Sequence, residues 1–181
     1  MISKWETLSE TQVADLKIFR AKSIERLNPV SMQRGFFTVL DSPDWVNIIP
    51  ITDDGNVIFV KQYRHGSDSV SLELPGGLKE QNESALDAAK RECMEETGFI
   101  GAGEPIQIGV SLPNPAFLTN KCTSFVWMDC KKLYGQQLDS HEVIDVVTIP
   151  IPEIRNLILS GELNHSVILT ALFYYSLKYG L

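Results

Sequence analysis

The clearest hydrophobic pattern of this chain lies in residues 45–62, where two apolar, β-branched runs surround a turn. The runs are residues 45–52 and 57–62, and residues 53–56, Asp-Asp-Gly-Asn, are of the kind that forms tight turns. A third short run, residues 70–74, follows a polar loop and leads into Pro-Gly-Gly. We therefore expect a hairpin and a further strand that delivers the chain to a glycine turn.

A helix is predicted from about residue 84 to residue 97. Ser84 or Asn82 can cap its start, alanines and a leucine that favour helix follow, and Gly98 can adopt the left-handed conformation that ends a helix. We expect the functional site at this helix and the glycine turn before it, because a run of carboxylates closes the helix. Its buried side is marked by Leu86, Ala89 and Cys93.

Before the central hairpin, two shorter alternating runs predict a pair of strands joined by a loop. They cover residues 16–23 and 36–40, with Asn-Pro and Arg-Gly between them. We assign residues 1–43 to an N-terminal strand extension and residues 44–181 to the main domain, because no Pro- or Ser-rich linker divides the chain further. Four aromatic residues are interpreted as core or subunit-interface positions, although an aromatic that stacks on a base would look the same: Trp5, Phe19, Phe36 and Phe37.

After the predicted helix, apolar runs predict three more strands and two helices. The strands cover residues 105–112, 123–128 and 143–149, and the helices cover residues 152–159 and 167–178. Pro152 suits the first turn of its helix, and Gly161 suits the end. In the last helix, the residues expected to pack on the sheet are Val167, Leu169, Leu172, Phe173 and Ser176.

Three glutamates of the first predicted helix, Glu92, Glu95 and Glu96, have the i, i+3, i+4 spacing that places side chains on one face. Like charges at this spacing repel, and acidic residues in the last turn oppose the helix dipole. The arrangement therefore costs stability unless a cation is bound, and hard carboxylate oxygens suit Mg²⁺ or Mn²⁺. Considered on the helix alone, an acidic face that is simply solvated is the commoner explanation.

The spacing around this helix decides between the two explanations. The fixed positions are Gly77, Glu83, Arg91, Glu92, Glu95, Glu96 and Gly98, with five residues between the first two and seven between the second and third. Together they resemble the Nudix box of the Nudix hydrolases. Cys93 stands where that family usually has an aliphatic residue, and a buried thiol packs as a small hydrophobe. The resemblance implies an α/β protein with the Nudix fold, an α/β/α sandwich with a mixed sheet, here with an N-terminal β-strand extension.

The resemblance also implies a metal centre built from this box. Glu92 and Glu96 are the implied primary ligands of Mg²⁺ or Mn²⁺. Glu95 is implied to be a further ligand or a base beside the metal. The backbone carbonyl of Gly76 is implied to complete the shell.

The chain before the box resembles the ADP-ribose pyrophosphatase branch of the family. Residues 57–64 end in Gln-Tyr-Arg and are followed closely by Glu-Leu-Pro-Gly-Gly. In that branch the arginine lies near the diphosphate, and Arg64 matches it; taken alone, a strand-end arginine is as often a surface salt-bridge partner. Pro115, sixteen residues after Phe99, matches a proline that marks the branch. The alternative interpretation is that Pro113 and Pro115 only stiffen the connection between two strands. Residues 116–120 lack the Gly and acidic residue that many members have here, so the terminal sugar is left open.

A general base is expected outside the box. In similar enzymes a glutamate just before a strand approaches the metal-bound water, and Glu142 matches it; His141 is a competing base, and a solvated loop glutamate is the alternative to both. Three other residues are interpreted as structural: Arg91 and Glu83 as an ion pair between turn and helix, and His165 as a packing or hydrogen-bonding residue at the start of the last helix.

Composition and charge agree with such an enzyme. The chain has 16 basic and 23 acidic residues, a net charge of −7, which disfavours a general nucleic-acid binder and implies that a phosphate substrate arrives with its metal. Its 3 cysteines lack close Cys/His pairing and are interpreted as reduced. No leader pattern or apolar run of membrane-spanning length is present, so we expect a cytoplasmic protein without a membrane partner.

From the resemblance we expect Mg²⁺-dependent hydrolysis of the diphosphate bond of a nucleoside diphosphate sugar, with ADP-ribose giving AMP and ribose 5-phosphate as first choice. A hydrolase of GDP-mannose or another nucleotide sugar would need the same box. A Nudix domain that senses a ligand without turnover is a third alternative, against which the intact carboxylates and the lack of an appended helix-turn-helix domain argue. Similar proteins dimerise by exchanging N-terminal strands, so the resemblance also implies a homodimer.

Overall fold

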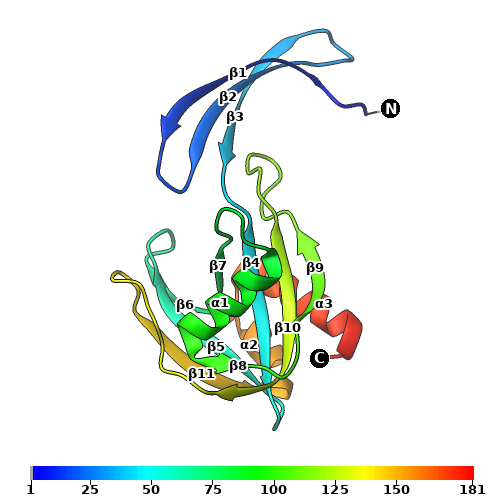
Figure 1. Ribbon diagram of the computed structural model, residues 1–181. Helices are drawn as coiled ribbons and strands as arrows, with labels where there is room; N and C mark the ends of the chain where they lie inside the picture. Colours follow the sequence, from blue (N-terminus) through cyan, green and yellow to red (C-terminus); the bar gives the residue numbers. More distant parts are fainter. Residues whose placement is uncertain (1) are drawn as a thin grey trace. The chain divides into compact units, whose positions relative to one another are not determined.

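The computed structural model describes residues 2–181, and the contacts within the chain separate it into two compact units (Figure 1). The first unit consists of residues up to 43 together with residues 112–121. The second unit consists of residues 44–111 and 122–181. Within the first unit, the segment 112–121 is joined to the N-terminal residues by hydrogen bonds, such as that from the N–H of Leu40 to the carbonyl of Phe117 at 2.7 Å.

The first unit is an antiparallel sheet in the order β1-β2-β3. Its strands are β1 (Glu6–Asp15), β2 (Arg20–Leu27) and β3 (Arg34–Asp41). The predicted pair of strands corresponds to β2 and β3 with shifted bounds. Strand β1 was missed, because it is largely polar and shows no alternating pattern. The predicted run 16–23 begins in the turn between β1 and β2, where Leu16 N–H donates to the carbonyl of Phe19 at 2.8 Å, and its second half lies in β2.

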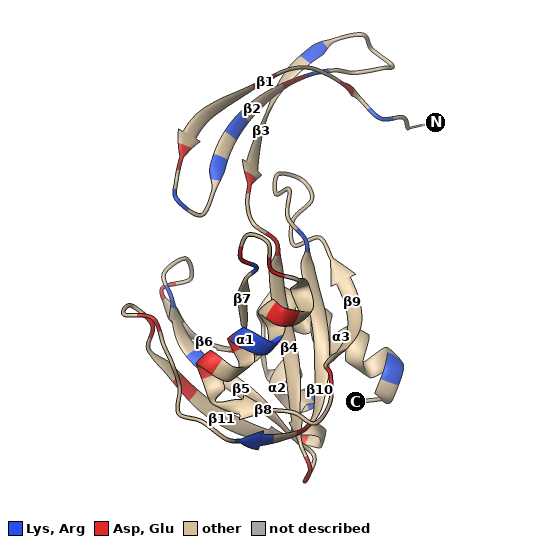
Figure 2. Ribbon diagram, viewed as in Figure 1, with Lys and Arg blue, Asp and Glu red and all other residues tan. Residues whose placement is uncertain are grey.

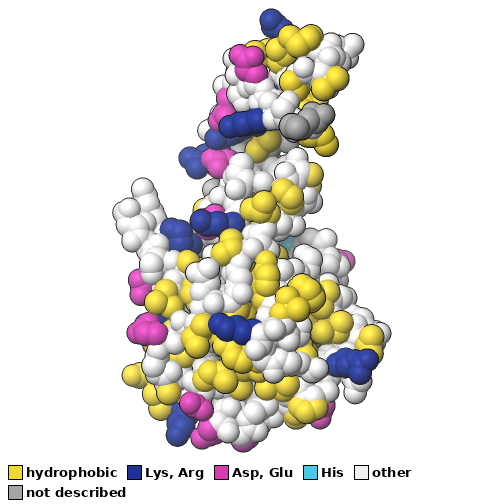
Figure 3. All heavy atoms as spheres, turned by 90° about the vertical axis from the view of Figure 1, so that its right-hand side faces the viewer, with side chains coloured by type: hydrophobic (Ala, Val, Ile, Leu, Met, Phe, Trp, Pro, Cys, Tyr) yellow, Lys and Arg dark blue, Asp and Glu magenta, His cyan; other side chains and the backbone are white. Residues whose placement is uncertain are grey.

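Basic and acidic residues both lie along this small sheet (Figure 2). Lys22 forms ion pairs with Glu10 at 2.9 Å and with Asp41 at 3.2 Å, which join all three strands. A sheet of three strands buries little, and large apolar side chains remain exposed on it, with Phe36 at 73% (Figure 3). Val13 and Phe37 are also exposed on its strands, and Leu16, Ile18, Val30 and Met32 are exposed in the turns between the strands.

The second unit contains a mixed sheet of eight strands in the described part of the chain. The order is β11-β5-β4-β10-β8, with β6 beside β5, β7 beside β4 and β9 beside β10. Only β4 and β10 pair in parallel, and the remaining pairs are antiparallel. The strands are β4 (Trp45–Thr52), β5 (Asn56–Arg64), β6 (Ser69–Glu73), β7 (Gly76–Leu78), β8 (Phe99–Ile100), β9 (Ile106–Ser111), β10 (Cys122–Lys132) and β11 (Ile144–Pro150).

Helices cover both faces of this sheet: α1 (Ala85–Thr97) on one, α2 (Ile151–Ser160) and α3 (Ser166–Tyr179) on the other (Figure 1). Neighbouring residues of β4 point to opposite faces and pack into two cores. Ile48 packs with Ala89 of α1, and Ile49 packs with Ile154 of α2 and Leu172 of α3. Burying each large aliphatic side chain stabilises the fold by roughly 1.5–3 kcal/mol. The predicted α/β/α sandwich is confirmed.

The predicted packing face of α3 is wrong in part. The buried residues are Ile168, Ala171, Leu172 and Tyr175, whereas Phe173 is 60% exposed. The sequence of this helix is apolar on nearly every side, so its pattern does not single out one face. No helix within residues 2–181 has the length and apolar character needed to cross a membrane.

Candidate active site

Helix α1 is fixed at both ends by caps. Ser84 is the N-cap, and its hydroxyl accepts a hydrogen bond from the backbone N–H of Asp87 at 3.0 Å. At the other end Gly98 has φ 74°, and its N–H donates to the carbonyl of Met94 at 2.8 Å. The two caps set the register of the helix and therefore the direction in which its glutamates project.

Glu96 is a buried carboxylate with only 4% of the residue exposed. Its Oε2 accepts a hydrogen bond from the backbone N–H of Gly76 at 3.0 Å, so the glycine turn contacts the end of α1 directly. Burial raises the pKa of Glu96 to about 8 despite this hydrogen bond, and the nearby carboxylates of Glu92 and Glu142 raise it further.

Glu92 lies against the same turn. A Cβ added at Gly77 would lie 2.6 Å from Oε1 of Glu92, so the Glu92 carboxylate lies directly against this glycine and would have to move for a larger residue. Burial also raises the pKa of Glu92, although the adjacent Arg91 opposes that shift. Glu95, one turn further along α1, has a side chain that is 34% exposed. The three glutamates of the sequence pattern therefore lie in three different environments.

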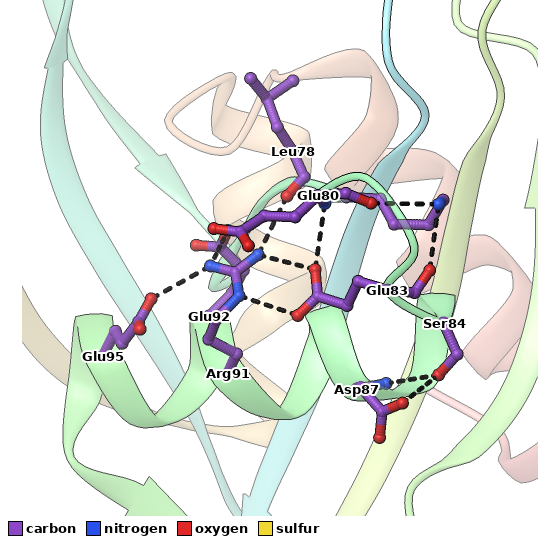
Figure 4. Close-up of polar contacts among 9 residues, drawn as sticks. Leu78, Glu80, Glu83, Ser84, Asp87, Arg91, Glu92 and Glu95 are labelled. Carbon is purple, nitrogen blue, oxygen red and sulfur yellow. Dashed lines mark hydrogen bonds and ion pairs between the residues drawn. The ribbon is translucent and has the colours of Figure 1, made fainter.

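Arg91 connects these glutamates to the turn (Figure 4). Its Nε and Nη2 donate to the two carboxylate oxygens of Glu83 at 2.9 and 3.1 Å, and Nη2 also donates to the carbonyl of Leu78 at 3.0 Å. Its Nη1 donates to Glu92 at 2.8 Å and to Glu95 at 3.1 Å. The predicted ion pair between Arg91 and Glu83 is confirmed, and the same guanidinium also holds two carboxylates of the box.

The donor set has the chemistry of a site for a hard divalent cation. Within residues 2–181, Glu96 forms no ion pair with a basic side chain. Its neighbours Glu92 and Glu142 are also acidic, so their charges repel a negative charge on Glu96. In the same residues no three His, Cys, Asp or Glu side chains already converge to hold a metal ion. Arg91 Nη1 bridges Glu92 and Glu95 instead. The carboxylates thus fit a cation by charge and donor type.

Arg64, at the end of β5, forms a two-point ion pair with Glu73 of β6. Its Nε and Nη2 lie 2.7 Å from the two carboxylate oxygens of Glu73. The hydrogen bonds to Glu73 raise the pKa of Arg64, and the charges of Glu96 and Glu142 add to the effect. Arg64 is therefore within electrostatic range of the box carboxylates, and it is also a salt-bridge partner, as the alternative interpretation of the sequence proposed.

Glu142 lies in the loop between β10 and β11. Its N–H donates to the carbonyl of Asp139 at 2.9 Å, and its Oε2 accepts from the N–H of Asp139 at 3.0 Å. Burial is the main cause of the raised pKa values of Glu92 and Glu96, and the charge of Glu142 adds to both, which places this loop beside the box. Figure 2 shows acidic positions on α1 and in this loop. His141 is exposed in the same loop.

This loop is fastened to the end of α1 by amide groups that the sequence analysis did not single out. The side-chain Nε2 of Gln136 donates to the carbonyl of Glu96 at 2.7 Å and to the carbonyl of Ile144 at 3.0 Å. The N–H of Gln137 donates to the carbonyl of Glu95 at 2.8 Å. A glutamine in a polar loop carries no pattern that would have marked it as a positioning residue.

The structure thus brings Arg64, Glu92, Glu96 and Glu142 together within the second unit. Pro115 lies in the first unit, in a turn where the N–H groups of Phe117 and Leu118 donate to the carbonyl of Asn114 at 3.3 and 2.8 Å. Its predicted contact with substrate stays a prediction. Glu73 was missed as a site residue, although an acidic residue in a short strand with apolar neighbours is a visible signal.

Comparison with known proteins agrees with this site. The model of the NUDIX domain matches residues 42–171, which is more than half of the chain. The chain belongs to the Nudix family, and it is a Nudix hydrolase related to ADP-ribose pyrophosphatases.

Two relatives and one solved structure illustrate the relationship. The ADP-ribose pyrophosphatase of Bacillus subtilis is 27% identical over 178 residues, 96% of this chain and 96% of that protein. The ADP compounds hydrolase NudE of Escherichia coli is 32% identical over 130 residues, 71% of this chain and 67% of that protein. A crystal structure of an ADP compounds hydrolase has a TM-score of 0.85 at 24% identity, over 97% of this chain and 94% of the other, and shows the shared fold.

Proposed function

We propose that this Nudix hydrolase cleaves the diphosphate bond of a nucleoside diphosphate sugar, most directly ADP-ribose to AMP and ribose 5-phosphate. The observation that carries the proposal is the carboxylate pair of the half-buried Glu92 and the buried Glu96, with Arg64 in electrostatic range. Relatives named for ADP-ribose and for ADP compounds support the choice of substrate. Such a substrate carries negative charge that needs both a cation and a donor on the protein.

In the proposed reaction, Glu92 and Glu96 would hold Mg²⁺ or Mn²⁺, with Glu95 and the carbonyl of Gly76 as further ligands. When bound at these residues, such an ion would supply positive charge against the diphosphate and lower the pKa of a bound water. Glu142 takes the proton of the attacking water. The water oxygen bonds to one phosphorus, the bond from that phosphorus to the bridging oxygen breaks, and the bridging oxygen leaves with the other phosphate.

Arg64 is proposed to contact the diphosphate, because an arginine beside a carboxylate cluster suits a substrate that brings its own negative charge. Pro115 is proposed to line the path of the sugar, on the strength of the sequence resemblance. The N-terminal strand extension, residues 1–43, is proposed to form the interface of a homodimer, and its exposed apolar side chains support this role (Figure 3). A cytoplasmic protein is proposed because Cys93, Cys122 and Cys130 are all unpaired and buried.

The test is an assay of the purified chain with Mg²⁺ against ADP-ribose, GDP-mannose, other nucleotide sugars and nucleoside triphosphates, with the products separated by chromatography. We expect AMP and ribose 5-phosphate from ADP-ribose at the highest kcat/KM. A higher kcat/KM for GDP-mannose or for triphosphates would replace the proposed substrate. Binding of ADP-ribose without any product would identify a sensor instead. Light scattering of the same preparation against a variant without residues 1–43 tests the dimer, which the truncation should abolish.

A further inference from the structure

Glu73 is the buried partner that determines where the Arg64 guanidinium lies. Glu73 ends β6, only 3% of it is exposed, and it immediately precedes the segment that forms the glycine turn. In the β5–β6 ladder Arg64 is opposite Ser69, whereas Glu73 is opposite Val60. Since a strand rises about 3.3 Å per residue, the two α-carbons are separated by roughly 13 Å along the strands.

This register means that the Arg64 side chain runs back along the sheet to reach Glu73. An arginine at the end of a hairpin strand would otherwise extend into solvent, where its long side chain has many rotamers. The ion pair with Glu73 turns the guanidinium away from the hairpin tip and into the electrostatic range of Glu96 and Glu142. The ion pair with Glu73 therefore fixes the direction in which the Arg64 side chain points.

The two hydrogen bonds to Glu73 also determine which nitrogen of Arg64 remains available to bind another group. A guanidinium has five N–H donors, and Glu73 takes one from Nε and one from Nη2. Within residues 2–181, Nη1 of Arg64 makes no hydrogen bond. An oxyanion that approaches this site therefore meets the Nη1 edge of Arg64, while the opposite edge is neutralised by Glu73.

The hydrogen bonds and the charge around Glu73 favour its ionised form. Burial disfavours its carboxylate, but the hydrogen bonds and the charge of Arg64 outweigh burial, so the pKa of Glu73 is lower than usual. The Nε2 of His165, the N-cap residue of α3, lies 3.9 Å from Oε2, the oxygen that also accepts from Nη2 of Arg64. A buried, charged carboxylate that accepts two hydrogen bonds is a rigid support for the Arg64 side chain, which must point in one direction.

We propose that Glu73 is a positioning residue that fixes Arg64 so that its Nη1 edge meets the substrate diphosphate. This proposal rests on the proposed function for the identity of the anion. The orientation of Arg64 itself is measurable without any substrate.

The kinetic test is a double-mutant cycle with Glu73→Gln and Arg64→Lys, assayed with ADP-ribose and Mg²⁺. Glutamine keeps the size of Glu73 but loses the two-point ion pair. Lysine keeps a cation beside Glu73 but lacks the planar fork that makes two parallel hydrogen bonds to a carboxylate and directs its remaining edge elsewhere. We expect each single variant to raise KM by roughly 10- to 100-fold, the effect of one charge-assisted hydrogen bond, with kcat changed much less. The double variant should be no more than about twofold worse than Arg64→Lys.

Two controls separate this role from a merely structural one. Asp53→Asn removes one negative charge from an exposed ion pair with Lys131 and should leave KM unchanged. Nitrogen-15 NMR of arginine-labelled protein gives a readout without turnover: two separate Nη signals for Arg64, identified by their loss in Arg64→Lys, should merge in Glu73→Gln as the guanidinium begins to rotate.

The outcomes distinguish the inference from the proposed function. If the wild-type chain hydrolyses ADP-ribose but Glu73→Gln has an unchanged KM, or if the effects of the two substitutions multiply in the double variant, the positioning role is wrong and the proposed function stands. Nη signals that are unchanged in Glu73→Gln would also overturn it. If the wild-type chain hydrolyses none of the diphosphate substrates, the proposed function fails first and the positioning role fails with it.

Discussion

Arg91 and Glu83 are joined by two hydrogen bonds, from Nε to Oε1 at 2.9 Å and from Nη2 to Oε2 at 3.1 Å. Glu83 also accepts a hydrogen bond from the N–H of Glu80 at 3.0 Å, so the pair joins the segment before α1 to the helix itself. The pair raises the pKa of Arg91 and lowers that of Glu83. Arg91 in turn holds Glu92 and Glu95, which makes Glu83 an indirect support of the metal ligands.

The first prediction is that Glu83→Gln lowers the free energy of unfolding by about 1–3 kcal/mol, because a charge-assisted, two-point contact is lost between side chains that are largely shielded from solvent. Urea unfolding followed by circular dichroism measures this change. Glu80→Gln, at an exposed neighbour whose carboxylate has no hydrogen-bond partner in the described residues, is the matched control and should unfold like the wild type. Equal midpoints for the two variants would mean that the pair contributes nothing.

The second prediction concerns the carboxylate pair of the box. Glu92→Gln or Glu96→Gln should fold normally yet lose at least about a hundredfold in kcat with Mg²⁺, because each removes one ligand charge. Stability should be unchanged or slightly higher, since each substitution removes a buried carboxylate beside others of the same charge. Titration with Mn²⁺ should show weakened binding in both variants.

Glu104→Gln is the control for this experiment, because Glu104 is an exposed carboxylate paired with Lys90 near the same helix. It should retain wild-type turnover and wild-type affinity for Mn²⁺. Full activity in Glu92→Gln and Glu96→Gln together would show that these residues are only a solvated acidic face, the alternative that the helix alone allows.

The third prediction is a dependence of stability on pH from the first unit. The hydrogen bond from Thr119 is the largest cause that lowers the pKa of Asp41 from its usual 3.8, and Lys22 and Arg20 act in the same direction. A carboxyl whose pKa is lower in the folded state stabilises the fold above its unfolded pKa, and that contribution is lost as the pH falls through the folded pKa. Stability should therefore decrease as the pH falls below about 4.

Urea midpoints measured between pH 7 and pH 3 test this dependence. In Asp41→Asn the slope below pH 4 should be smaller than in the wild type. Asp145→Asn, at an exposed position of β11, is the control and should keep the wild-type slope. An identical slope in the Asp41 variant would assign the acid sensitivity to other carboxylates.

The features of this protein that are predictable from its sequence are those in which the interacting residues are close together along the chain. The caps of α1, the shared face of Glu92 and Glu96, and the ion pair of Arg91 with Glu83 follow from spacing along one helix and its preceding turn. The central strands follow from β-branched runs between turn residues. These features were predictable because the residues that interact lie within about twenty positions of one another in sequence.

Other features depend on neighbours that no local pattern reveals. Strand β1 is polar and is held by pairing with β2, and the buried face of α3 is chosen by the sheet that it meets. The contact between Arg64 and Glu73 depends on the register of two strands, which a sequence of alternating residues does not determine. Gln136 acts through backbone carbonyls, to which any hydrogen-bond donor at the right place can bind.

The last prediction is that Glu142 is the general base. The loop that contains Glu142 is held to the end of α1 by Gln136, and the charge of Glu142 raises the pKa values of Glu92 and Glu96. The present bond between Glu142 Oε2 and the N–H of Asp139 is a single neutral donor on an exposed loop, which a substrate-bound water can replace at small cost. Glu142→Gln should lower kcat by roughly 10²- to 10⁴-fold while the affinity for Mn²⁺ stays close to that of the wild type. His141→Ala is the control. Normal turnover in Glu142→Gln together with a large loss of turnover in His141→Ala would assign the general base to His141. Normal turnover in both variants would assign proton removal to Glu95 or to the metal-bound water alone.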